Sequence, residues 1–113
     1  MPSFYSWDQI ESVEVIPHAF RKTIEGKQLK IGRVYYGPGS DTPEHKHFAE
    51  QIFIMIDGEV WFKIEDEEVV AKAGDVVVVP SNVPHACHSD SGGTYIVIVP
   101  RQSVHMEPQS VPS

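Results

Sequence analysis

The chain has 113 residues, of which 41% are hydrophobic, and a formal net charge of −7 at pH 7. This length fits one domain, and this hydrophobic content is typical of a folded globular protein. An acidic surface repels phosphate backbones, so we expect no nucleic-acid partner. We also expect no membrane partner, because no window approaches the roughly 20 apolar residues of a membrane-spanning helix.

The N-terminal residues and the cysteine content set an expectation about location. Residues 1–8 lack the basic start and apolar core of a signal peptide. Cys87 is the only cysteine, which excludes an intrachain disulfide and favours a reducing compartment. We therefore expect a soluble cytoplasmic protein.

Short β-type runs separated by turn residues fill most of the chain. The expected strands are, in chain order, Val13–Ile16, Phe20–Ile24, Gln28–Tyr36, Gln51–Ile56, Glu59–Glu65, Glu68–Ala71, Asp75–Val79, His85–His88 and Thr94–Val99. No stretch has a helical pattern of useful length, Ser6–Val13 being the best. Many short strands spaced about 8–12 residues apart indicate an all-β sandwich or barrel.

Three features of this pattern carry more specific signals. In residues 59–65 every second residue is apolar, which is typical of a strand with one buried face. The dipeptide Asp57-Gly58 predicts a two-residue hairpin turn just before that strand. Val76–Val79 is apolar at every position, which is typical of a strand covered on both sides.

A pair of histidines is the first sign of a metal site. Residues i and i+2 of a strand point the same way about 6.6 Å apart, and His45 and His47 have this spacing. Two imidazoles so placed can converge on one ion at about 2.0–2.2 Å from each nitrogen. Gln51 begins an apolar strand and could add an amide oxygen, whereas only folding could bring His85 to the same place.

The spacing of these residues resembles the two sequence motifs of the cupin superfamily. The first motif, G-x5-H-x-H-x3/4-E-x6-G, is similar to the segment from Gly39 through His45, His47 and Gln51 to Gly58. The second, G-x5-P-x-G-x2-H-x3-N, is similar to residues 74–89, which include His85.

This resemblance implies a cupin jelly-roll β-barrel, a double-stranded β-helix, as a single domain. It would have N-terminal strands in residues 1–27 and a barrel core in residues 28–100. Residues 101–113 would form a flexible or subunit-contacting tail. Apart from the resemblance, we expect a homodimer, because a partner subunit would help a domain of this size to fold. The barrel interior would hold one divalent metal ion (Fe, Mn, Ni, Zn or Co) on His45, His47, Gln51 and His85.

The chain departs from the cupin motifs at three positions. Gln51 stands at the usual glutamate position, and the neighbouring Glu50 should point outward because a one-residue shift reverses the face of a strand residue. Asn82 replaces a turn glycine and tolerates a left-handed backbone better than most residues. Ser89 replaces the last asparagine and can still form hydrogen bonds, while its neighbour His88 is a surface residue or a supporting partner.

The glutamine changes the charge that the ion would present to a ligand. A carboxylate lowers the net charge of a divalent site to +1, whereas an amide leaves it at +2. The more positive ion is the stronger Lewis acid and binds anionic, oxygen-rich substrates better. We therefore expect a small anionic substrate.

Strand parity predicts which residues surround the metal. The expected pocket-lining residues are Phe53, Met55, Phe62, Cys87, Ile96 and Ile98. Either Arg33 and Tyr35 or Val34 and Tyr36 should face the cavity, because the two pairs alternate along one strand. The candidate catalytic residues are accordingly His45, His85, Arg33 and Tyr35.

Three classes of function fit these residues. The first is an enzyme of isomerase, lyase or cyclase type, similar to the pectin-degradation cupins that act on unsaturated uronates and carry glutamine at the usual glutamate position. In that enzyme the metal would act as a Lewis acid on a small keto or carboxylate-bearing substrate. The second is a metal-dependent dioxygenase, and the third is a non-catalytic small-ligand-binding or sensor cupin.

Overall fold

A computed structural model of the protein describes residues 3–101. Its elements are η1 (Trp7–Gln9), β1 (Val13–Ile16), β2 (Ala19–Glu25), β3 (Leu29–Tyr36), β4 (Ser40–His45), β5 (Gln51–Ile64), β6 (Glu67–Lys72), β7 (Val76–Val79), β8 (His85–Ser89) and β9 (Gly93–Pro100). The all-β expectation is confirmed, and the only helix among the described residues is a single 3-10 turn. None of their helices is long and apolar enough to cross a membrane. The predicted tail lies outside the described residues, apart from Arg101.

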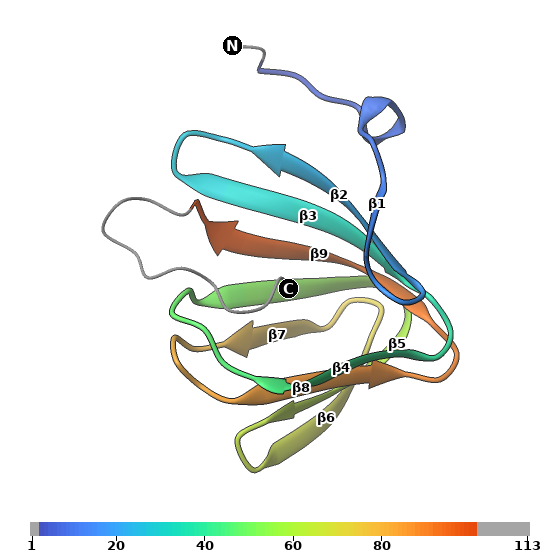
Figure 1. The fold of residues 1–113 in the computed structure, drawn as a ribbon, viewed down its shortest axis with the longest axis vertical. Coiled ribbons are helices and arrows are strands. Elements are labelled where there is room, and N and C mark those ends of the chain that lie inside the picture. Colours follow the sequence, from blue (N-terminus) through green and yellow to red (C-terminus); the bar gives the residue numbers. More distant parts are fainter. Residues whose placement is uncertain (1–2, 102–113) are drawn as a thin grey trace.

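The strands form a nearly closed antiparallel barrel (Figure 1). Their hydrogen-bonded order is β1-β2-β3-β9-β5-β8-β4, with β6 and β7 also pairing with β5. The first half of β5 pairs with β7 and β9, and its second half pairs with β6 and β8. Strand β5 therefore belongs to both walls of the barrel and joins them.

The hairpin predicted at Asp57-Gly58 is wrong, because β5 runs through it for 14 residues. Instead the pairing of β5 with β9 shifts between Met55 and Asp57, which is a β-bulge. An extra residue at a bulge reverses the face of every later side chain. Odd-numbered residues such as Phe53 therefore point inward before the bulge, and even-numbered residues such as Phe62 point inward after it.

The barrel interior is filled by aromatic and aliphatic side chains. The ring of Phe53 lies at its centre, with its centroid 5.1 Å from that of Phe62 and 5.2 Å from that of Tyr95. The fully buried residues that surround these rings include Val34, Tyr36, Met55, Val60 and Val79. Both walls contribute to this cluster, and Phe53 and Tyr95 also line the small cavity beside His45 and His85.

Two further expectations about strands need correction. The valines of β7 are covered on one side only, since Val77 and Val79 are buried while Val76 is 58% and Val78 is 48% exposed. Strand β4 was not expected at all, because its sequence contains Pro43 and charged residues. It tolerates a proline because it pairs only with β8 and is an edge strand.

Gly58 provides a test of the bulge. Its φ is +75°, and a Cβ placed there would overlap the carbonyl oxygen of Gly92. We predict that Gly58→Ala lowers the free energy of unfolding by roughly 3 kcal/mol, combining left-handed strain with overpacking. Gly74→Ala is the matched control, because Gly74 has φ +92° but its Cβ would meet nothing within 4 Å.

The control should cost only about 1 kcal/mol, the strain alone. Urea denaturation of both variants measures the difference. Equal losses for the two variants would show that close contact at the bulge does not limit the fold.

Candidate metal centre

Two neighbouring strands bring His45 and His85 together. His45 is the last residue of β4 and His85 is the first of β8, and the two are direct cross-strand partners. The centroids of their rings lie 4.4 Å apart. The antiparallel pairing of β4 with β8 therefore makes the contact that the sequence spacing alone could not predict for His85.

His47 and Gln51 complete the cluster from the other side. His47 lies in the loop after β4 rather than on a strand, and its ring centroid is 5.3 Å from that of His45 and 5.0 Å from that of His85. Gln51 is the first residue of β5 and is 1% exposed, whereas Glu50 is exposed as expected. One ligand nitrogen from each histidine lies within 4.8 Å of the others.

Backbone carbonyl groups fix the tautomer of each histidine. The Nδ1 atoms of His45, His47 and His85 lie 2.9, 3.2 and 2.9 Å from the carbonyl oxygens of Pro43, Ala49 and Val83. A carbonyl oxygen only accepts, so each Nδ1 carries the hydrogen and donates it. Each Nε2 is thereby left with a free lone pair, the arrangement that orients metal-binding imidazoles in proteins.

Three buried atoms of the cluster have no hydrogen-bond partner within the described chain. They are Nε2 of His45, Nε2 of His47 and Oε1 of Gln51. Buried polar atoms without partners cost roughly 1–3 kcal/mol each, and a protein tolerates that cost where a ligand satisfies them. Three imidazole nitrogens and one amide oxygen suit a divalent transition metal, so these residues fit the metal that the motifs imply.

Burial keeps two of the histidines in the neutral form that a metal needs. Desolvation lowers the pKa of His47 and of His85 below the usual 6.5, with the nearby His45 adding to the effect. Hydrogen bonds to Ala49 and Val83 oppose the shift but are the smaller cause. A neutral imidazole keeps its Nε2 lone pair, so the site stays ready for a cation at neutral pH.

The space beside the histidines is small and contains no carboxylate. A cavity of about 10 Å³, room for about one water, is lined by Thr42, His45, Gln51, Phe53, His85, Cys87 and Tyr95. Burial raises the pKa of the Cys87 thiol to about 12 and raises the pKa of the Tyr95 phenol well above its usual value. Both groups therefore stay protonated and uncharged at neutral pH.

The predicted pocket-lining residues are partly correct. Phe53 and Cys87 line the cavity, and Met55 and Phe62 are buried in the core. The positions expected for Ile96 and Ile98 are wrong, because Tyr95 and Val97 of β9 point inward and the two isoleucines lie on the outer face. The sequence of β9 shows that its side chains alternate between two faces, but it contains no signal of which face points inward.

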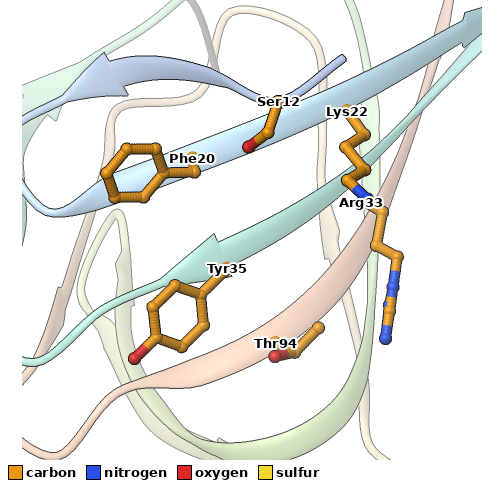
Figure 2. Close-up of a pocket in the computed structure, with 6 residues that line it drawn as sticks. All are labelled: Ser12, Phe20, Lys22, Arg33, Tyr35 and Thr94. Carbon is orange, nitrogen blue, oxygen red and sulfur yellow. The ribbon is translucent and has the colours of Figure 1, made fainter. Parts of the chain in front are cut away.

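The structure also decides the alternative on β3. Val34 and Tyr36 are each 1% exposed and face the interior, whereas Tyr35 is 51% exposed. Arg33 and Tyr35 line a separate hollow on the outside of the barrel, together with Ser12, Phe20, Lys22 and Thr94 (Figure 2). The structure therefore does not place Arg33 and Tyr35 beside the candidate metal site, where the sequence analysis expected them.

Sequence reasoning missed Thr42 and Tyr95 in the cavity wall. Thr42 lies on the strand that was not expected, and Tyr95 has the opposite parity from the one assumed for β9. The Tyr36 hydroxyl donates to the carbonyl oxygen of Cys87 at 3.2 Å and lies 2.9 Å from Oγ1 of Thr42. Since that phenol has one hydrogen, Thr42 donates to Tyr36 and offers the cavity only a lone pair.

The departures from the cupin motifs have structural explanations. Asn82 adopts the left-handed backbone at φ 61°, and its N–H donates to the carbonyl oxygen of His47 at 2.8 Å. Ser89 is buried, and its hydroxyl donates to the carbonyl oxygen of Glu59 at 2.6 Å. Arg101 contacts the carbonyl oxygen of Gly26 rather than the cavity.

His88 lies on the surface, as one of the two alternatives proposed. Its Nε2 is 2.6 Å from Asp90 and its Nδ1 is 3.3 Å from Asp41, which is its cross-strand partner on β4. The hydrogen bond to Asp90 and then that to Asp41 raise the pKa of His88. Protonated His88 therefore ties β4 to β8, the two strands that carry His45 and His85.

The raised pKa of His88 predicts a pH-dependent stability. The unfolded side chain titrates near 6.5, so the stabilisation is complete below that pH. It is lost as the pH rises through the higher folded-state value. We predict that His88→Gln lowers the melting temperature more at about pH 6 than at about pH 9, measured calorimetrically on metal-free protein. A loss that does not vary with pH would contradict this linkage.

The four candidate ligands predict how metal affinity responds to substitution. Gln51→Glu should bind a divalent ion such as Co²⁺ more tightly, because a carboxylate adds a negative charge to an otherwise neutral set of donors. His45→Ala and His85→Ala should each weaken binding by at least about 100-fold while circular dichroism stays unchanged. Titration calorimetry measures all three, and equal or weaker affinity of Gln51→Glu would refute the charge argument.

Three comparisons with known proteins agree with this fold and site. Residues 32–106 match the family described as the Cupin domain. The structure superimposes on an RmlC-like cupin from Shewanella frigidimarina with a TM-score of 0.84 and 21% identity, covering 93% of this chain and 96% of that one. It superimposes on KdgF from a Halomonas species with a TM-score of 0.82 and 22% identity, covering 89% and 96%.

The sequence is also similar to part of a larger enzyme. It is 26% identical to the 3-hydroxyanthranilate 3,4-dioxygenase of Bos taurus over 85 residues, 72% of this chain and 29% of that protein. The chain thus spans less than a third of that relative, so the likeness concerns the shared domain. Taken with the barrel and the histidine cluster, the family match over residues 32–106 shows that this chain belongs to the Cupin domain family.

Proposed function

We propose that this protein is a metal-dependent enzyme that acts on a small anionic, oxygenated substrate by isomerase, lyase or cyclase chemistry. The observation that carries the proposal is the set of buried, unpartnered donor atoms on His45, His47 and Gln51, to which His85 adds a third imidazole. A divalent ion bound there would act as a Lewis acid, polarising a carbonyl or carboxylate oxygen of the substrate.

The charge of the site favours an anionic substrate. All four candidate ligands are neutral, and the described residues that line the cavity include no carboxylate. A bound divalent cation would keep its full charge of +2 in a desolvated place, where electrostatic attraction is stronger than in water. A substrate with a carboxylate or an adjacent keto oxygen would supply the missing negative charge.

The chain's own groups would orient the substrate. Thr42 offers a hydrogen-bond acceptor, because its hydrogen is used by Tyr36. A substrate hydroxyl that reaches the cavity could therefore donate to Oγ1 of Thr42, while the ring of Phe53 supplies an apolar part of the cavity wall. Because the Cys87 thiol and the Tyr95 phenol stay protonated, the described cavity wall offers no anionic base. This favours reactions that depend mainly on polarisation of a substrate oxygen by the bound ion.

One neighbour of similar fold carries a name that belongs to this class of reaction. The polyketide cyclase RemF from Streptomyces resistomycificus superimposes with a TM-score of 0.82 at 15% identity, covering 100% of this chain and 88% of that one. That enzyme's name places cyclase chemistry in the same barrel. At this identity the likeness establishes the fold alone, so the reaction assigned to the present chain rests on its own ligand set.

A dioxygenase is the second candidate, favoured by the sequence similarity to 3-hydroxyanthranilate 3,4-dioxygenases, which reaches 30% identity over 66 residues of the Xanthomonas euvesicatoria protein. A redox-active ion on the same residues would serve that chemistry. The two candidates differ in what they require. An oxygenase needs dioxygen and a redox metal, whereas Lewis-acid chemistry needs neither.

Zinc separates them, because Zn²⁺ has no redox chemistry. We predict that the zinc-loaded protein converts a member of a panel of keto acids and unsaturated uronates without oxygen, followed by absorbance and mass spectrometry. His45→Ala, treated identically, should lose both the metal and the conversion. Turnover only with iron and with oxygen consumption would establish the oxygenase instead. Tight binding of a panel member without any chemical change would contradict both and indicate a sensor.

A further inference from the structure

The outer face of the barrel wall formed by β2, β3, β9, β5 and β7 is unusually apolar for a solvent-facing sheet. One row of cross-strand neighbours runs across all five strands and consists of Ile24, Ile31, Ile98, Ile52 and Val78. None of these side chains packs against the buried core. An antiparallel sheet with one face on the core normally has polar residues on the other face, so this row indicates a covered surface.

The next row divides into a basic half and an apolar half. Its members are Lys22, Arg33, Ile96, Ile54 and Val76, again in register across the five strands. Lys22 and Arg33 are direct cross-strand neighbours, an arrangement of like charges that destabilises a sheet when nothing lies between them. Lys22 donates to the carbonyl oxygen of Trp7 at 2.9 Å, which leaves its charge uncompensated.

Arg33 lacks any hydrogen bond or ion pair with residues 3–101, although its side chain is half-buried. It lines a hollow of about 220 Å³ whose other described walls are Ser12, Phe20, Lys22, Tyr35 and Thr94. In Figure 2 the two aromatic rings lie at one end of this hollow and the two basic side chains at the other. A half-buried charge needs an anion, and this lining supplies none.

The same face also carries an unpaired acid on the far side of β9. Asp57 lies in the third row, in register with Thr94 and therefore with Tyr35 and Phe20. It is exposed, and it forms no ion pair with the described residues. The cation on β3 and the anion on β5 are thus separated by the central strand β9.

We propose that this face is the interface with a second copy of the chain, related by a two-fold axis that runs along β9. Such an axis lays β3 of one copy over β5 of the other. Arg33 then lies one row, about 6.8 Å along the strand, from Asp57 of the partner subunit, and its long side chain can span that offset; the symmetry makes the contact twice. The apolar first row then covers its own symmetry copy at the roughly 10 Å spacing of packed sheets, and the basic half of the second row lies over the apolar half of the partner's second row. A second copy of the chain thus accounts for the apolar rows, the unpaired Arg33 and the unpaired Asp57.

The sheet face provides most, but not all, of the area that a stable dimer needs. With strands about 4.8 Å apart and rows about 6.8 Å apart, two rows on five strands and a third row on four cover on the order of 450 Å². Each subunit of a standard interface buries roughly 600–1,000 Å². The N-terminal segment beside β2 can supply the remainder, because Phe4 is 84% exposed and Tyr5 is 40% exposed there.

A charge exchange tests the proposal. We predict that the wild-type chain is a dimer by sedimentation equilibrium, and that Arg33→Glu and Asp57→Lys each raise its dissociation constant roughly 30-fold or more. The double variant Arg33→Glu/Asp57→Lys should recover most of the affinity, because it restores both pairs with reversed sign. If the losses of dimer affinity in the two single variants simply combine in the double variant, the Arg33–Asp57 pairing is overturned.

A second pair of variants tests the apolar rows without relying on those charges. Val76→Lys should dissociate the dimer, whereas Val70→Lys should not, because Val70 is similarly exposed (51%) on β6 of the other wall. A monomeric wild-type chain, or a dimer that withstands Val76→Lys and Arg33→Glu, would overturn the proposal. Binding of free acetate or phosphate to a monomer at Arg33 would mean that the hollow is a small-anion site instead.

Discussion

The bulge in β5 is the constraint on which the rest of the structure depends. This strand pairs with β7 and β9 along its first half and with β6 and β8 along its second half. It therefore belongs to both walls, and the side chains of both halves must point into the same barrel interior. A regular strand could not do so with this sequence, since Phe53 and Phe62 have opposite parity. The extra residue between Met55 and Asp57 corrects the phase and allows the two rings to meet with centroids 5.1 Å apart. Gly58 is needed there because the chain passes directly against Gly92.

The position of the metal centre follows from the same arrangement. Gln51 is the first residue of β5. Its amide is buried because it lies on the same inward face of the strand as Phe53 and Met55. His45 and His85 are brought opposite each other by the pairing of β4 with β8, and the aromatic side chains of Phe53 and Tyr95 line the cavity beside them. The backbone carbonyl groups that accept from each Nδ1 then leave the Nε2 lone pairs as the free groups. The site is therefore a consequence of burial and backbone geometry, with no carboxylate to hold the imidazoles in place.

The sequence predicted the barrel class, eight of the nine strands and the four candidate ligands, because each depends on local spacing or on a motif. It could not predict β4, since Pro43 and the charges beside it are unfavourable for a strand and only the edge position next to β8 allows them. It could not place Ile96 and Ile98 either, because β9 is apolar on both faces and alternation alone does not say which face is inside. The Asp57-Gly58 signal failed for a related reason: a left-handed glycine serves a bulge as well as a hairpin turn.

Strands that are apolar on both faces show the same limit of sequence reasoning on the outer surface of the barrel. The run Val76–Val79 indicated a strand covered on both sides, and within one chain only Val77 and Val79 are covered. Sequence reasoning detects that a surface avoids water, but it cannot tell whether the cover comes from the same chain or from another. On β5 the residues Ile52 and Ile54 alternate with Gln51 and Phe53, so the proposed subunit interface and the metal centre lie on opposite faces of one strand. A second copy packed on the outer face would hold that strand in place, and with it Gln51, the first residue of the strand, whose amide oxygen would face a bound ion.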